Sequence, residues 1–83
     1  MPRYFFNYRA NGVLEKDPEG SELPSDEAAI REAKLGAREV ASQKVRSGEA
    51  IRSECFELTN ADGIVITTIP LRSVVILEAQ DAL

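Results

Sequence analysis

The sequence predicts an α+β domain in which two strands, one long helix and two more strands follow in that order. Three observations support this β-β-α-β-β prediction. The N-terminal residues alternate between two faces, residues 26–47 form a helical pattern interrupted only by a glycine, and residues 53–69 form two strand-like runs around an Asp-Gly turn. Runs of strands around a single helix favour one antiparallel sheet with the helix packed on one face.

The first strand is expected at residues 3–9, which hold four of the five aromatic residues of the chain. Alternation places Phe5 and Asn7 on one face of the strand. The other face carries three aromatic residues, Tyr4, Phe6 and Tyr8. Asn11-Gly12 is a strong hairpin signal because both turn residues tolerate positive φ, so a short return strand is expected at residues 13–16.

Residues 17–25 are rich in turn-forming residues and are expected to connect the hairpin to the helix. Ser25 is a suitable N-cap, and Gly48 is placed to end the helix. One side of this helix consists mostly of small residues: Ala29, Ile30, Ala33, Gly36, Ala37, Val40 and Ala41. Small residues leave room for large ones opposite, so the aromatic face of the first strand is expected to pack here.

The C-terminal part is expected to form a hairpin around Asp62-Gly63, with Phe56 and Leu58 facing the core. Pro70 should end the second strand of this hairpin because proline lacks an amide hydrogen. Residues 70–73 are expected to form a helical turn, followed by a short strand or extended segment. Cys55 alternates with Phe56 and should face away from the helix.

Composition limits the chemistry of this chain. Its 83 residues form one domain, residues 1–83, with a net charge of −4, one cysteine and no histidine. A disulfide is excluded, a zinc site has almost no ligands, and no cofactor is expected. The acidic balance argues against broad nucleic-acid binding. There is no membrane-spanning apolar run and no signal-peptide pattern, so a cytoplasmic location is expected.

Several motifs together resemble a known family. They are MPRYFF at the N-terminus, D-x-x-G-x-E-L-P at residues 17–24, the Ala-rich helix, F-E-L-T-x-x-D-G at residues 56–63 and I-P-L-R at residues 69–72. This set is similar to a small uncharacterised domain family common in rhizobial and related alphaproteobacteria. The resemblance implies a cytoplasmic bacterial protein of unassigned function and supplies no active site. Asn7 stands where many members carry histidine, and Leu71 stands where the family usually has an aromatic residue.

More loosely, the opening strands and the helix resemble antitoxin domains with a partial ribonuclease-H-like fold. This is an analogy of fold and carries little functional weight.

Two groups of residues are candidate contacts. Arg31, Lys34 and Arg38 lie along one flank of the helix, where they would grip an anion or an acidic partner, or would form an ordinary salt-bridged surface with Glu27 paired to Arg31. Phe5, Asn7 and Leu35 lie off the expected core and are candidate interface residues, because a thin one-sided sheet gains from a second layer. Further candidates have simpler structural interpretations: a cation site in the acidic loop, base stacking on the tyrosines, and a nucleophilic Cys55 without a base.

The sequence therefore predicts a small interaction or regulatory module, not an enzyme, that forms a homodimer; another protein partner is also compatible with it. An antitoxin-like or nucleic-acid-linked component that uses the basic helix flank is the alternative. An enzyme ranks third because no acid–base pair stands out in the sequence.

Overall fold

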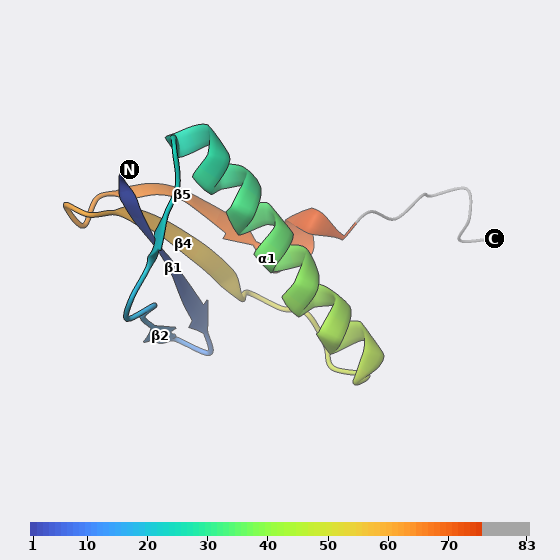
Figure 1. Cartoon of the computed structure of the whole chain (residues 1–83). Coiled ribbons are helices and arrows are strands. Elements are labelled where there is room, and N and C mark those ends of the chain that lie inside the picture. Colours follow the sequence, from blue (N-terminus) through green and yellow to red (C-terminus); the bar gives the residue numbers. More distant parts are fainter. Residues whose placement is uncertain (76–83) are drawn as a thin grey trace.

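In the computed structural model, which describes residues 1–75, one antiparallel sheet of five strands carries a single helix, as the α+β prediction requires. Figure 1 shows the helix crossing one face of the sheet. The elements are β1 (Arg3–Ala10), β2 (Val13–Glu15), β3 (Ser21–Glu22), α1 (Asp26–Arg46), β4 (Cys55–Asn60), β5 (Val65–Pro70) and the 3-10 helix η1 (Leu71–Val74).

The sheet is built around β1 and β4, and its order is β2-β1-β4-β5, with β3 also pairing with β1. The long β1–β4 pairing runs from Tyr4 opposite Asn60 to Arg9 opposite Cys55. Asn11 and Gly12 both have positive φ, at 55° and 76°, which the predicted tight hairpin requires. β5 pairs with β4 and is the last strand on its side of the sheet.

The helix has the predicted ends. The Ser25 hydroxyl oxygen accepts a hydrogen bond from the Ala28 amide at 3.1 Å, and Gly48 beyond the C-terminus has φ of 74°. Its buried residues recur at every fourth position: Ala29, Ala33, Ala37 and Ala41. Because these side chains are methyl groups, the helix backbone lies close to the sheet.

The core joins this alanine face to large side chains of the sheet. Leu58 and Leu71 are fully buried, and Tyr4 is 2% exposed. Phe6, Tyr8 and Phe56 pack against the core but keep part of their surface exposed. The large-on-small packing predicted from the sequence is therefore present, with Tyr4 as the most deeply buried of the aromatic residues.

The sequence predicts only turns between the first hairpin and the helix, and this prediction is wrong at residues 21–22. Residues 21–22 form β3, whose partners in β1 are Arg3 and Tyr4. The return strand also ends at Glu15, one residue earlier than predicted. The predicted helical turn exists as η1, one residue later than expected, whereas the segment expected after it lies almost wholly outside the described residues. None of the helices in residues 1–75 has the length and apolar character needed to cross a membrane.

The alanine face provides a test of this packing. Ala37→Leu should lower the free energy of unfolding by about 1–3 kcal/mol, because three more carbon atoms have no space against the sheet. Ser42→Leu, at an exposed helix position, should change it by less than about 0.5 kcal/mol. Urea unfolding followed by circular dichroism measures both. Equal effects of the two substitutions would contradict close packing at Ala37.

Candidate functional site

The loop between β2 and β3, residues 16–20, closes on the edge of β1 through Asp17, and we call it the Asp17 loop. One carboxylate oxygen of Asp17 accepts a hydrogen bond from the Phe6 amide at 3.2 Å, and the other accepts one from the Gly20 amide at 3.3 Å. The Asp17 amide donates to the side-chain oxygen of Asn7 at 2.9 Å. β2 pairs with β1 before this point and β3 pairs with it afterwards, so the Asp17 carboxylate fills the gap in the strand ladder.

Gly20 brings the same loop against β1 and is required there by space as well as by conformation. Its φ is 71°, which disfavours other residues. A Cβ atom at this position would lie 2.6 Å from the Tyr4 carbonyl oxygen and 2.9 Å from the ring of Phe5. The Phe5 ring therefore lies against the loop and is only partly exposed.

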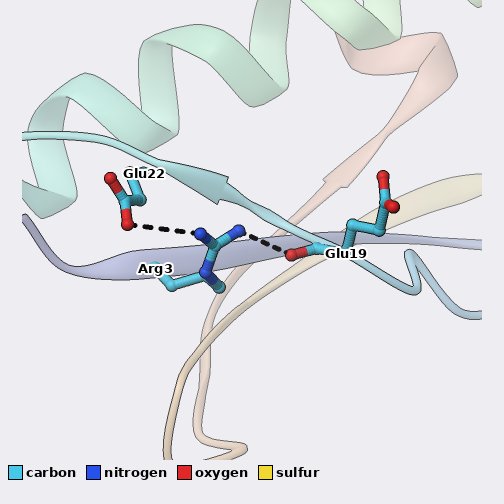
Figure 2. Close-up of polar contacts among 3 residues, drawn as sticks. All are labelled: Arg3, Glu19 and Glu22. Atoms are coloured by element: carbon cyan, nitrogen blue, oxygen red, sulfur yellow. Dashed lines mark hydrogen bonds and ion pairs between the residues drawn. The ribbon is translucent and has the colours of Figure 1, made fainter.

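Arg3 holds the far side of this loop. Its guanidinium donates to the Glu19 carbonyl oxygen at 2.7 Å and to the Glu22 carboxylate at 3.2 Å. Figure 2 shows Arg3 reaching from β1 to both partners. All three side chains are accessible to solvent, so these contacts add little to stability and mainly fix the path of residues 19–22.

A depression of about 470 Å³ lies on the face of the sheet that α1 does not cover, between the Asp17 loop and the β4–β5 turn. We call it the open-face depression. Its lining includes Phe5, Asn7, Lys16, Glu57, Thr59 and Val65. Because β1 and β4 pair residue by residue, Phe5 lies opposite Thr59 and Asn7 lies opposite Glu57. The predicted interface residues Phe5 and Asn7 therefore line a shared hollow.

Asn7 is more enclosed than an interface residue on a bare sheet face would be. It is 8% exposed, because the Asp17 loop covers it. Its side-chain oxygen is held by the Asp17 amide, so its NH₂ group points toward the Thr59 hydroxyl, at 3.4 Å. The sequence placed Asn7 on this face but gave no sign that a loop would enclose it.

The helix flank and Leu35 lie elsewhere on the molecule. Arg31, Lys34 and Arg38 are all exposed, and none forms an ion pair with any residue in the described range 1–75. The expected pairing of Glu27 with Arg31 is therefore not formed, which corrects the salt-bridged interpretation. Leu35 is 55% exposed on the same helix. The structure thus separates these helix residues from Phe5 and Asn7, which belong to the opposite side of the sheet.

Two further polar contacts were not foreseen from the sequence. Lys44 of the helix contacts the Glu54 carboxylate at 3.2 Å, and Glu54 is 7% exposed. Backbone N–H donors and Lys44 lower the pKa of Glu54 in spite of its burial, so it is held as a carboxylate. Arg9 donates to the Glu57 carboxylate at 2.7 Å. Both ion pairs tie separate elements of the fold together: Arg9–Glu57 joins β1 to β4, and Lys44–Glu54 joins the helix to the segment before β4.

Cys55 fits the structural interpretation better than the nucleophilic one. It is a buried free thiol, and burial raises its pKa. Thiolate is therefore less available than in an ordinary cysteine. No group of three or more metal-ligating side chains gathers anywhere in the part of the chain that the structure describes, including the acidic loop.

These features define a small one-helix α+β domain with a sheet open on one face and polar side chains that mainly secure its loops. A family model described as a domain of unknown function (DUF6894) matches residues 3–72, and the chain belongs to that family. The predicted membership of an uncharacterised domain family is confirmed at that level. Comparisons with curated proteins and with solved structures gave no match.

The close approach at Gly20 can be tested by its effect on the stability of the fold. Gly20→Ala should destabilise the fold by about 2–4 kcal/mol, because it combines positive φ with a collision against the Tyr4 backbone. Gly48→Ala is the matched control: its φ is 74°, and nothing lies within 4 Å of the added carbon. That substitution should cost about 1–2 kcal/mol. Chemical denaturation compares the two variants, and equal losses would refute the close approach at Gly20.

Tyr4 generates a pH prediction. Its hydroxyl donates to the Asp26 carboxylate at 2.6 Å, and this bond, followed by burial, raises the pKa of Tyr4 from 10.0 to about 12. A raised pKa means that the folded state favours the neutral phenol. Its contribution to stability is complete below the unfolded pKa and falls as pH rises from 10.0 toward about 12.

Tyr4→Phe should therefore show a smaller loss of stability across this alkaline range than the unchanged protein does. Urea midpoints at a series of pH values measure the difference between the two proteins. Every other ionisable group is present in both proteins, so its contribution cancels in that difference. Parallel curves for the two proteins would show that Tyr4 ionises as easily in the folded chain as in the unfolded one.

Proposed function

We propose that this chain is a small interaction module of the bacterial cytoplasm without catalytic chemistry of its own, and that it associates with a second copy through the outer edge of β5. The single observation that carries the proposal is that the outer edge of β5 is left unpaired in the described part of the chain. β5 is the terminal strand of the sheet, and no strand in residues 1–75 pairs with its outer side. Such an edge offers unpaired N–H and C=O groups to another strand.

The composition of β5 favours pairing. Five consecutive β-branched residues, 65–69, precede Pro70, and the strand carries no charge. Val65, its first residue, is 50% exposed, and Ile64 just before it is 60% exposed. Edge strands are usually protected by charges, prolines or bulges. Here an irregularity lies opposite residues 58–59 of β4 and the proline stands at the end, so residues 67–69 between them form the pairing segment.

The occupant that this edge fits best is a second copy of the chain. In a two-fold antiparallel arrangement each strand meets itself, so a charged strand would place like charges near one another. β5 avoids this because it is uncharged. The opposite edge of the sheet is less suitable: β2 has three residues, β3 has two, and Glu15 and Glu22 lie within them. Self-association would also enlarge a small core.

The basic helix flank supports a nucleic-acid role less well. Arg31, Lys34 and Arg38 are exposed, but Glu32 and Glu39 stand on the same helix, and the chain carries a net charge of −4. Neutralisation of phosphates supplies most non-specific affinity for nucleic acids, and this balance opposes it. We therefore favour self-association over the antitoxin-like alternative.

The test is the molar mass in solution. Size-exclusion chromatography with light scattering at high micromolar concentration should give twice the 9.1 kDa of one chain. Thr68→Lys, at an exposed position of β5, should weaken association at least about fivefold by bringing like charges together. Ser53→Lys adds the same charge at an exposed position outside the strand and should leave association unchanged.

Circular dichroism of both variants verifies that they are folded. A single-chain mass for the unchanged protein at the highest concentration would overturn self-association. A dimer that Thr68→Lys leaves intact would move the contact away from the β5 edge.

A further inference from the structure

We infer that the open-face depression is a binding site for a small organic acid, namely a carboxylate attached to a compact apolar group. This inference does not depend on self-association, since the depression lies on a face of the sheet and the proposed dimer contact lies at its edge. It rests on the chemistry that the lining residues leave unused.

The floor of the depression presents hydrogen-bond donors. The side-chain oxygen of Asn7 is occupied by the Asp17 amide, so Asn7 turns its NH₂ group toward Thr59. An NH₂ group carries two hydrogens, and a hydroxyl that accepts one bond can still donate its own. Among residues 1–75, Thr59 accepts one Asn7 hydrogen, and no residue accepts the other one or the Thr59 hydroxyl hydrogen. Two donors therefore remain for a ligand.

The charged residues around the depression also favour an anionic ligand. Glu57 lines it, but its carboxylate is held by Arg9 at 2.7 Å. Asp17 lines it as well, and both its oxygens accept backbone N–H groups. Lys16 forms no ion pair with any described residue and lines the same hollow. Lys16 is therefore the charged lining residue without a partner among residues 1–75, and a ligand that accepts hydrogen bonds and carries negative charge complements it.

The rest of the lining is apolar and limits the size of the ligand. Phe5, Leu14, Pro18 and Val65 surround the donors, and the volume of about 470 Å³ is within the range of sites that hold small molecules. A compact aliphatic or aromatic group would contact these side chains while its carboxylate meets Lys16, Asn7 and Thr59. An organic acid would remove these apolar side chains from contact with water, whereas an inorganic anion would not. The depression therefore favours the organic acid.

The experiment is a titration of the full chain followed by ¹H–¹⁵N NMR. Benzoate and hexanoate are the probes, and benzamide and hexanamide are neutral analogues of similar shape. The acids should cause saturable shifts at the amides of Asn7, Thr59 and Gly63, and should bind at least about fivefold more tightly than the amides. Inorganic phosphate should shift these resonances less than either acid.

Variants locate the contact. Lys16→Gln should weaken benzoate binding about fivefold to tenfold, whereas Lys34→Gln, an exposed lysine on the helix, should leave it unchanged. Thr59→Val removes the hydroxyl donor with little change of shape and should also weaken it. The absence of saturable shifts, equal affinity for benzamide and benzoate, or indifference to Lys16→Gln would each overturn the inference.

Discussion

The close approach between the alanine face of α1 and the aromatic face of the sheet determines the rest of this structure. Four buried alanines, from Ala29 to Ala41, allow the helix backbone to come near β1 and β4, and Tyr4 and Leu58 fill the remaining space. Because one helix covers only one face, the other face of the sheet has no covering layer of secondary structure within residues 1–75. The Asp17 loop covers part of it and leaves the open-face depression beside it.

The Asp17 side chain accepts a hydrogen bond from a backbone amide of β1 that a continuous edge strand would otherwise pair with its own backbone. The Asp17 carboxylate receives the Phe6 amide, and Gly20 permits contact with Tyr4 and Phe5. The same loop orients Asn7, so the donors of the depression follow from the way in which the sheet edge is sealed. The D-x-x-G part of the motif thus has a structural role, and any binding at the depression depends on it.

Features that depend on residues close together in the sequence were predicted correctly. Ser25 and Gly48 bounded the helix, Asn11-Gly12 located the first hairpin, and alternation placed Phe5 and Asn7 on the face away from the helix. β3 was not predictable, because two residues have no periodicity and their pairing depends on contacts with Arg3 and Asp17 far along the chain. The enclosure of Asn7 was missed for the same reason. The Glu27–Arg31 pair failed because two exposed side chains gain too little from pairing to fix their conformations.

The sheet has one edge that is short, interrupted and closed by Asp17, and another that is long and uncharged. This asymmetry bears on how far any assembly can grow. Pairing of two copies through the long edge would leave the short, interrupted edge of each copy, formed by β2 and β3, facing outward. Short edge strands are poor templates for further pairing, so growth beyond such a pair would be disfavoured. In such a pair, the Asp-x-x-Gly loop that interrupts the short edge bears on the size of the assembly as well as on the local fold.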